Sequence, residues 1–254
     1  MRALTIAGSD PSGGGGVQRD LMTFAALGIS GTSCLASLTA QNTTGVVETL
    51  AVSGTFLAQQ IETLLVDLPP DASKTGLLPS AETVAVVASF GKRLGPLVVD
   101  PVLVSTGGQT LVEASVPEAL RAQLLPCTAL VTPNLAEAEA LAGFPVTDVD
   151  SMAAAGRALL DTGVGAVLIK GGHLAGDPVD LLLTDAGAEK FSAPRLEVPD
   201  VRGTGCALSA AIATGLARGL PVRAAVVEAR RFVRDSLRTA APVGSGAWHL
   251  GDTP

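Results

Sequence analysis

The sequence predicts a doubly wound α/β fold with a mostly parallel central sheet. Short apolar runs alternate along the chain with longer stretches of helical period, as in repeated strand–helix units. Apolar residues make up 47% of the 254 residues, and aromatic residues only 3%. The core must therefore be aliphatic, which is typical of strands buried on both faces of a parallel sheet. No repeat, linker or charge block divides the chain, so we expect one domain over residues 1–254.

The elements follow from these runs in order. Apolar segments of strand length predict strands at residues 3–7, 32–38, 46–52, 72–75, 97–99, 129–132, 166–169 and 179–183. Segments of helical period predict helices at residues 17–27, 55–67, 81–93, 111–124, 135–143, 151–162, 206–218 and 223–240. We expect the arginines of the last helix to form a solvated face, namely Arg230, Arg231, Arg234 and Arg238.

The charge of the chain restricts its partners, and its cysteines indicate its compartment. The formal net charge of −7 argues against a nucleic acid or an anionic membrane as partner, although local amides and a metal ion can still hold ATP. No targeting signal precedes the first expected strand, and the uncharged stretch 24–47 is too polar to span a membrane. Three cysteines without paired spacing indicate a reducing cytoplasm. The sequence leaves a homodimer open.

Unusual residues gather where expected strands end. Polar or glycine-rich segments follow five of these strands, at residues 9–16, 41–43, 100–101, 132–134 and 170–173. In open parallel sheets, ligands bind beyond the carboxyl ends of the strands. We therefore expect these segments, distant in sequence, to share one binding rim.

Gly203, Thr204, Gly205 and Cys206 open an apolar helix. Glycines at a helix start leave backbone N–H groups free to form an anion hole for a phosphoryl group. An ordinary glycine turn into a packed helix is the alternative. The first helical turn lowers a thiol pKa, so we expect Cys206 to accept a proton as a thiolate, rather than serve only as a small core residue.

Three charged residues on the rim indicate phosphate chemistry. Asp100 ends an apolar strand and could reach Mg²⁺, which prefers one or two carboxylates together with phosphates. Glu137 could support the same ion, or it could simply stabilise a helix N-terminus. Lys170 ends a buried strand, which favours a nearby anion, with a side chain that reaches out to solvent as the alternative.

Two polar residues near the expected first and second strands could bind a heterocycle. Gln41 both donates and accepts hydrogen bonds, so it can pair with the edge of an aminopyrimidine. Asp20 could accept a hydrogen bond from the exocyclic amine, or it could serve only to stabilise the start of its helix.

Seven motifs occur in one order along the chain, at residues 7–21, 40–43, 74–78, 99–102, 132–138, 170–173 and 203–206. Together they resemble the hydroxymethylpyrimidine/phosphomethylpyrimidine kinases of thiamine biosynthesis, which are members of the ribokinase-like superfamily. The resemblance extends from residue 3 to about residue 245. It implies a ribokinase-like three-layer α/β/α sandwich and two successive ATP-dependent phosphorylations, first of the pyrimidine alcohol and then of its monophosphate.

The resemblance also implies residue roles. The residues expected around the pyrimidine are Gly8, Gly15, Asp20, Gln41, Leu77 and Val102. Asp100 and Glu137 would serve Mg²⁺, and Asn134 and Lys170 would bind the nucleotide phosphates. The Gly203–Gly205 amides, including that of Thr204, would form the anion hole, and Cys206 would be the catalytic base.

This chain departs from the family at three positions. Leu77 stands where methionine is frequent, Arg202 replaces a frequent histidine, and Met22 replaces a frequent lysine. Two alternatives stay open. A pyridoxal kinase of the same superfamily is the nearest, although Gln41 favours an aminopyrimidine. A non-catalytic ligand-binding relative is the other, although it would not need Asp100, Lys170 and Cys206 together.

Overall fold

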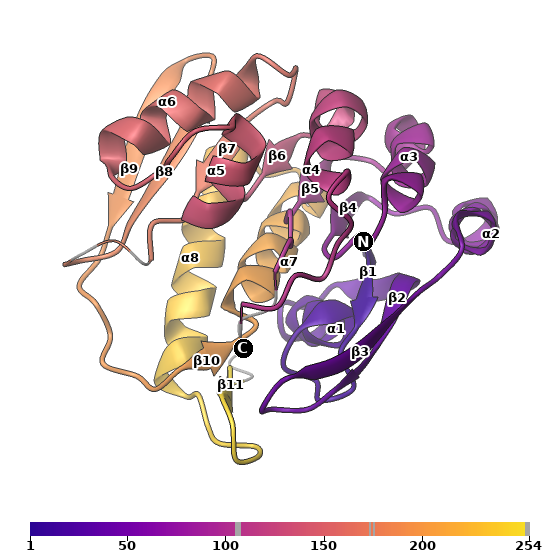
Figure 1. Ribbon diagram of the computed structural model, residues 1–254, viewed down its shortest axis with the longest axis horizontal. Helices are drawn as coiled ribbons and strands as arrows, with labels where there is room; N and C mark the ends of the chain where they lie inside the picture. Colours follow the sequence, from indigo (N-terminus) through magenta and orange to yellow (C-terminus); the bar gives the residue numbers. More distant parts are fainter. Residues whose placement is uncertain (105–107, 173, 175, 252–254) are drawn as a thin grey trace.

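A nine-stranded sheet organises the chain. The computed structural model describes residues 1–104, 108–172, 174 and 176–251. Within these residues the strand order is β3-β2-β1-β4-β5-β6-β7-β8-β9 (Figure 1). Strands β2, β1, β4, β5, β6 and β7 run parallel to one another. At one edge β3 pairs antiparallel with β2, and at the other β8 pairs antiparallel with both β7 and β9. The predicted mostly parallel sheet is confirmed.

The elements lie close to the predicted ones. The strands are Arg2–Ser9 (β1), Ser30–Gln41 (β2), Val46–Ala51 (β3), Ala72–Thr75 (β4), Leu97–Val99 (β5), Leu130–Val131 (β6), Val167–Ile169 (β7), Val179–Thr184 (β8), Gly187–Ser192 (β9), Val201–Arg202 (β10) and Trp248–His249 (β11). The α-helices are Gly16–Ala26 (α1), Gly54–Asp67 (α2), Ala81–Ser89 (α3), Val116–Ala119 (α4), Leu135–Ala142 (α5), Val149–Leu160 (α6), Thr204–Ala217 (α7) and Val222–Arg238 (α8). Short helical turns lie at Gly91–Arg93 (η1), Leu120–Leu124 (η2) and Leu125–Cys127 (η3).

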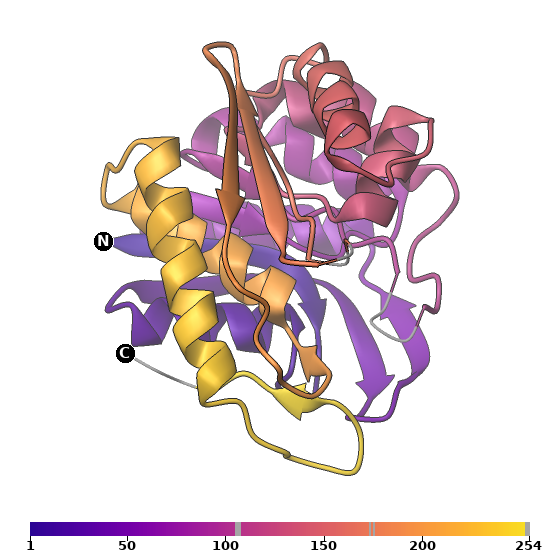
Figure 2. The same ribbon diagram turned by 90° about the vertical axis from the view of Figure 1, so that its left-hand side faces the viewer.

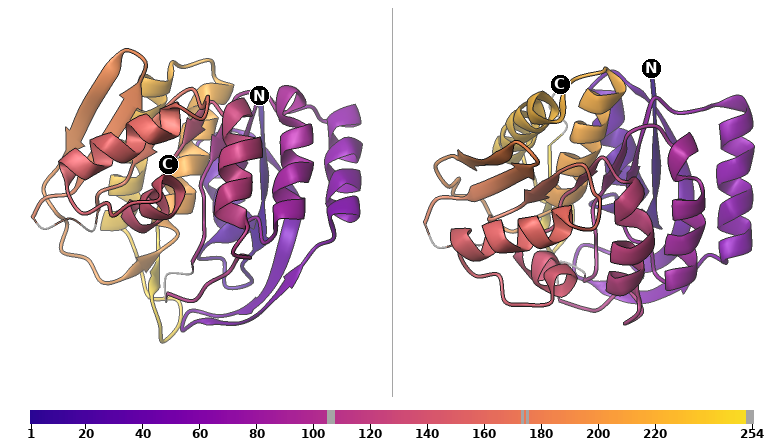
Figure 3. Two further views of the ribbon diagram at one scale, coloured as in Figure 1. Left: turned by 45° about the horizontal axis from the view of Figure 1, so that its top comes forward. Right: turned by 90° about the horizontal axis from the view of Figure 1, so that it is seen from above.

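Helices cover both faces of the sheet, which gives the three predicted layers. Helices α2 to α6 pack on one face, and α1, α7 and α8 pack on the other (Figure 3). Helix α8 lies beside the β8–β9 hairpin (Figure 2), where Arg230 pairs with Asp180 and stacks on Phe191. None of the described helices is long and apolar enough to cross a membrane.

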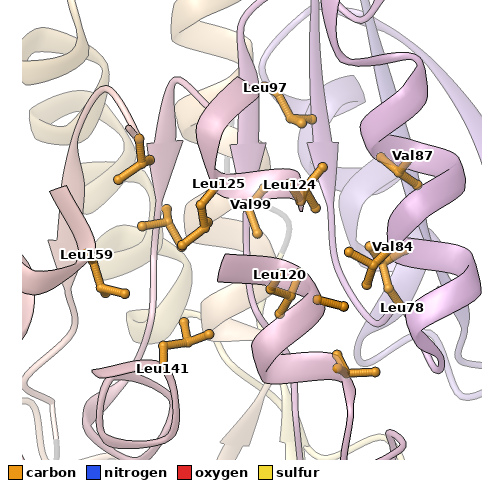
Figure 4. Packing of buried hydrophobic residues seen from close by; sticks show 14 of the residues in the cluster. Leu78, Val84, Val87, Leu97, Val99, Leu120, Leu124, Leu125, Leu141 and Leu159 are labelled. Carbon is orange, nitrogen blue, oxygen red and sulfur yellow. The ribbon is translucent and has the colours of Figure 1, made fainter. Parts of the chain in front are cut away.

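Successive side chains along each strand point to opposite faces of the sheet, so the core consists of two clusters. Leu97 and Val99 of β5 face the α2–α6 layer, where Leu120 and Leu124 pack near them (Figure 4). Val98, between them, joins the cluster on the α7 side. This arrangement explains why the predicted core is aliphatic: both faces of the central strands are buried, so most of their successive side chains are apolar.

Three expectations were wrong, each for a local reason. The helix expected at 111–124 begins only at Val116, because Pro117 fits the first turn of a helix but not its interior. Strand β9 was not expected, because it is an exposed edge strand with charged side chains instead of an apolar run. The arginines of α8 are not all solvated, since Arg230 is bonded to Asp180.

Candidate active site

A cavity of about 130 Å³ opens at the carboxyl ends of β1 and β4, against the start of α7. Five of the six residues expected around the substrate line it, namely Gly8, Gly15, Gln41, Leu77 and Val102, and so do Gly203 and Cys206 of the expected catalytic turn. Segments more than 190 residues apart in the chain, around Gly8 and Gly203, therefore line the same cavity. The shared rim that the sequence predicted is present for these residues.

The glycine-rich loop after β1 is held by a single carboxylate. Asp10 is buried, and it accepts hydrogen bonds from the backbone N–H and the hydroxyl of Ser12 (2.9 and 2.7 Å) and from the Gly15 N–H (2.8 Å). Gly16 has φ +57°, and a Cβ there would come within 2.4 Å of the Gly8 carbonyl oxygen. Only glycine permits this turn, which brings the backbone of Gly15 and Gly16 to the cavity.

Apolar and amide residues line another part of the cavity. The side chain of Leu77 packs against Gly8, where a Cβ would lie 3.2 Å from the leucine Cδ2. Gln41 lines the cavity from the end of β2, and its Oε1 accepts a hydrogen bond from the Thr39 hydroxyl at 3.2 Å. An amide beside an apolar wall suits a flat heterocycle that has both donors and acceptors.

Asp20 does not line the cavity. Its fully buried carboxylate accepts from both the Lys74 Nζ (2.9 and 3.0 Å) and the Thr5 hydroxyl (2.6 Å). The cavity wall instead contains Lys74. This geometry does not support the direct hydrogen bond that we expected between Asp20 and a substrate amine. It shows a carboxylate that fixes a buried cation at the floor of the cavity.

The turn that opens α7 has the form expected of an anion hole. Gly203 has φ +81°, and a Cβ there would lie 2.0 Å from the Gly14 carbonyl oxygen, so the turn requires glycine. Thr204, Gly205 and Cys206 form the first turn of α7. Backbone N–H groups in a first turn have no helical acceptors, and the helix dipole adds partial positive charge.

The expected lowering of the Cys206 pKa is wrong. Burial raises the pKa of this thiol to about 11, and the charge of Lys74 and a hydrogen bond from the Gly16 backbone lower it only in part. The carboxylates of Asp20 and Asp100 act in the same direction as burial. The helix start does not decide the protonation of this thiol, because desolvation and two carboxylates outweigh it.

Lys170 joins the expected metal and nucleotide residues. Its Nζ lies 2.8 Å from Asp100 Oδ1 and 3.8 Å from Glu137 Oε2. Glu137 and Asn134 cap α5 reciprocally: the Asn134 N–H donates to Glu137 Oε2 at 2.7 Å, and the Glu137 N–H donates to Asn134 Oδ1 at 2.9 Å. Glu137 thus acts at the start of a helix, as one of the two interpretations predicted, and it also faces Lys170. Its support of a metal ion stays a prediction.

This cluster meets the anion hole. A Cβ on Gly205 would lie 3.3 Å from Lys170 Nζ and 3.7 Å from Asp100 Oδ2. Burial raises the pKa of Glu137 to about 7, against the charge of Lys170. Burial also acts to raise the pKa of Asp100, but Lys170 and Lys74 hold it below its ordinary value. Asp100 is therefore the fixed negative charge at neutral pH, and Glu137 is the group that titrates.

The described residues contain no cluster of three or more histidine, cysteine, aspartate or glutamate side chains arranged to hold a metal ion. Asp100 and Glu137 alone could supply two carboxylates, so any Mg²⁺ here needs ligand phosphates as well, which is its usual preference. His173, the last residue of the predicted segment 170–173, lies outside the described residues.

Three residues of the site had no role in the sequence analysis. Asp10 and Lys74 lie within quoted motifs, but their partners are a loop backbone and a side chain 54 residues away. Arg202 was noted only as a departure, yet it is buried and lines the cavity. Lysine within the fully buried strand β4 was the one available signal, since a buried charge needs a partner.

The fold and the site together define a small-molecule phosphotransferase: an α/β/α sandwich whose substrate cavity opens onto an anion hole at a helix start. The phosphomethylpyrimidine kinase family model matches residues 10–251. The chain belongs to this family. Its ribokinase-like architecture is thereby confirmed as well.

Curated relatives of this chain support the same family. The hydroxymethylpyrimidine/phosphomethylpyrimidine kinase of Rhizobium meliloti is 43% identical over 244 residues, which cover 94% of this chain and 91% of that protein. The thiamine biosynthesis bifunctional protein ThiED of Geobacter sulfurreducens is 44% identical over 248 residues, 96% of this chain. The chain spans half the length of that bifunctional protein.

Solved structures include kinases of two substrate classes. The phosphomethylpyrimidine kinase of Clostridium difficile superposes with a TM-score of 0.82 at 37% identity, covering 92% of this chain and 98% of that chain. The pyridoxal kinase of Staphylococcus aureus in complex with ADP gives a TM-score of 0.91 at 30% identity, covering 99% of this chain and 93% of that chain.

Proposed function

We propose that this chain transfers the terminal phosphoryl group of ATP to the hydroxymethyl group of 4-amino-5-hydroxymethyl-2-methylpyrimidine, and then to the resulting monophosphate, in thiamine biosynthesis. The observation that carries the proposal is the junction of the Gln41–Leu77 cavity with the Gly203–Cys206 turn. An alcohol held in this cavity lies beside amides suited to a phosphoryl group in transfer.

ATP as the phosphoryl donor is supported by the Staphylococcus aureus neighbours, which are complexes with ADP and with AMP-PCP. In this chain Lys170 would bind the nucleotide phosphates, with Asn134 beside it at the start of α5. Asp100 and Glu137 would hold Mg²⁺ together with phosphate oxygens. The ion, when bound, neutralises charge on the phosphoryl oxygens.

Cys206 is the residue that we propose as proton acceptor. It lines the cavity beside the anion hole and within the field of Lys74. In the transfer, the alcohol O–H passes its proton to the sulfur, the oxygen forms a bond to the terminal phosphorus, and ADP leaves. Because the thiol pKa is raised, this step depends on the small thiolate fraction, or on proton transfer late in the reaction.

Pyridoxal is the competing substrate, because a pyridoxal kinase superposes with the higher of the two TM-scores. Sequence identity favours the pyrimidine, as does Gln41, whose amide can pair with a ring nitrogen and an exocyclic amine. The deciding experiment measures ADP release with the pyrimidine alcohol, its monophosphate and pyridoxal. Higher kcat/KM for pyridoxal than for the alcohol would overturn the proposal.

Gln41→Leu sharpens this assay. The variant keeps approximate size but removes both hydrogen bonds, which cost about 0.5–1.5 kcal/mol each when they are lost. We expect kcat/KM for the pyrimidine alcohol to fall about tenfold, with a smaller change for pyridoxal and little change in the KM for ATP. Equal losses on both alcohols would show that Gln41 supports the wall without recognising the ring.

The homodimer and the cytoplasmic location that the sequence allowed remain predictions. For the dimer we propose the β2–β3 edge as the contact. Leu38 and Leu50 are neighbours across these two strands and are 41% and 65% exposed. Light scattering of the wild type and of Leu50→Glu tests this contact: a dimer that the substitution leaves intact would exclude it.

A further inference from the structure

Arg202 is a buried cation in the wall of the substrate cavity. The residue is among those that line the cavity, and it is only 6% exposed. Its Nη1 donates to the Asn42 carbonyl oxygen at 3.0 Å. Among the described residues no carboxylate forms a salt bridge with this guanidinium. Its hydrogen-bond partner is thus a neutral carbonyl, although the guanidinium is almost fully removed from water.

The carboxylates nearest in the site are already engaged. Asp10 lines the same cavity, but its two oxygens accept from Ser12 and Gly15. Asp20 is bonded to Lys74, the other cation of the wall. The two cations therefore differ: Lys74 carries its counter-ion with it, and Arg202 does not.

The surroundings of Arg202 are electropositive. Burial lowers the pKa of His249, and the charges of Arg19 and Arg202 lower it further, against the single carboxylate of Asp10. A buried charge without a counter-ion is costly, and such an arrangement persists when a ligand of opposite charge completes it. The end of the cavity next to Gly203 is consequently built for an anion.

The two acceptor substrates of the proposed reaction differ in charge. The pyrimidine alcohol is neutral, whereas its monophosphate carries about two negative charges at pH 7. Both must bring an oxygen to the anion hole at Gly203–Cys206, so the phosphate of the monophosphate must lie in the part of the cavity that Arg202 borders. A guanidinium presents a planar fork of donors that matches phosphate oxygens.

We infer that Arg202 binds the phosphate of the monophosphate and determines the efficiency of the second phosphorylation, an inference that rests on the proposed function. The Nη1 bond to Asn42 and the pairing of β10 with β11 hold the guanidinium in place before the substrate arrives. Recognition of the neutral alcohol does not need this charge.

The test is steady-state kinetics of the wild type and Arg202→Gln with the alcohol and with the monophosphate, at saturating ATP. We expect the loss in kcat/KM to be larger for the monophosphate than for the alcohol by a factor on the order of 10–100, the usual value of a hydrogen bond to a charged group. Arg202→Lys keeps the charge but not the planar fork of donors, so its kcat/KM for the monophosphate should lie between those of the wild type and Arg202→Gln.

Substrate binding measured in the absence of nucleotide gives a second test of the inference. Calorimetric titration should show the dissociation constant of the monophosphate rising at least tenfold in Arg202→Gln, with a smaller change for the alcohol. Arg218→Gln is the matched control, because Arg218 also donates to a backbone carbonyl, that of Leu27, but at the opposite end of α7 and exposed to solvent. It should leave both substrates at their wild-type values.

The outcomes separate the two hypotheses. Equal losses on both substrates in Arg202→Gln would overturn the inference and leave Arg202 as a support for the loop at Asn42. A wild type that phosphorylates neither pyrimidine would instead overturn the proposed function. A wild type active on both, with selective loss on the monophosphate, establishes the assignment of Arg202.

Discussion

Two buried lysines border the site, and their surroundings differ. Lys74 lies within β4 with its side chain and that of Asp20 wholly buried, whereas Lys170 follows β7 with 16% of its side chain exposed. Burial acts to lower the pKa of Lys74, but Asp20 and the neighbouring Cys206 and Asp100 raise it above its ordinary value. Lys170 has two carboxylate neighbours, at 2.8 and 3.8 Å, and reaches solvent at the rim.

The difference separates a fixed charge from an adjustable one. The Lys74–Asp20 pair is closed, since each partner satisfies the other and water cannot reach them. The Lys170 cluster is open, and one of its carboxylates, Glu137, has a pKa raised to about 7. A group that titrates near neutrality can respond to a ligand, whereas the fully buried Lys74–Asp20 pair is held by its own hydrogen bonds, even though burial raises the pKa of Asp20. Four predictions test this contrast.

The largest effect on stability is expected at the closed pair. Lys74→Met leaves the Asp20 carboxylate buried without a cation, which should lower the free energy of unfolding by about 3–5 kcal/mol. Urea unfolding measures the change. The double variant Lys74→Met/Asp20→Leu should recover most of the loss, because two apolar side chains can replace a buried pair at little cost. A loss below about 1 kcal/mol in the single variant would contradict the closed pair.

Lys170→Met should affect activity more than stability. Because Lys170 reaches solvent and Glu137 can take up a proton, the loss of stability should be less than half that of Lys74→Met. Activity should fall about 10²–10³-fold, as when one donor to a transferred group is removed. The comparison of urea midpoints and kcat for the two variants is decisive. A variant with wild-type kcat would exclude Lys170 from the phosphate site.

Cys206 lies in the field of both regions, since Lys74 lowers its pKa while Asp20 and Asp100 raise it. With a thiol pKa of about 11, kcat should rise with pH from 6 to 9 if the thiolate is the base. Cys206→Ala should lower kcat roughly 10²–10⁴-fold and abolish the rise, while the affinity for the pyrimidine changes little. A pH profile that is the same in Cys206→Ala and the wild type would remove Cys206 from the mechanism.

The sequence predicted the sheet and the rim because both depend on local patterns. The alternation of short strand-like segments with helical ones placed β4 and β5 at their observed bounds, and polar residues at strand ends located Asp100 and Lys170. The Lys74–Asp20 pair could not be predicted, because it joins residues 54 positions apart through the packing of α1 on the sheet. The raised pKa of Cys206 could not be predicted for the same reason, because burial and carboxylates distant in sequence determine it, and not the helix start.

Measured per pH unit, the smallest effect is expected at the open cluster of Lys170, Asp100 and Glu137, in the dependence of stability on pH. The folded-state pKa of Glu137 is raised from 4.5 to about 7, so the folded chain holds a proton that the unfolded chain releases between these values. The stabilising contribution is therefore complete below pH 4.5 and is lost as the pH rises to 7. In this interval the wild type should lose up to about 1 kcal/mol of unfolding free energy per pH unit from this group.

Glu137→Gln removes the titrating group but keeps the cap, since a glutamine oxygen can still accept from the Asn134 N–H. Urea unfolding at half-unit steps between pH 4.5 and 7 should show a flatter profile for this variant than for the wild type. Asp100 does not mask the effect, because its pKa is lowered. The pKa of Asp20 is raised by burial, but this carboxyl is present in both proteins and cancels in the comparison. Glu139→Gln, an exposed position on the same helix, should keep the wild-type slope. Identical slopes for Glu137→Gln and the wild type would show that Glu137 is charged throughout, and the cluster would then be as fixed as the Lys74–Asp20 pair.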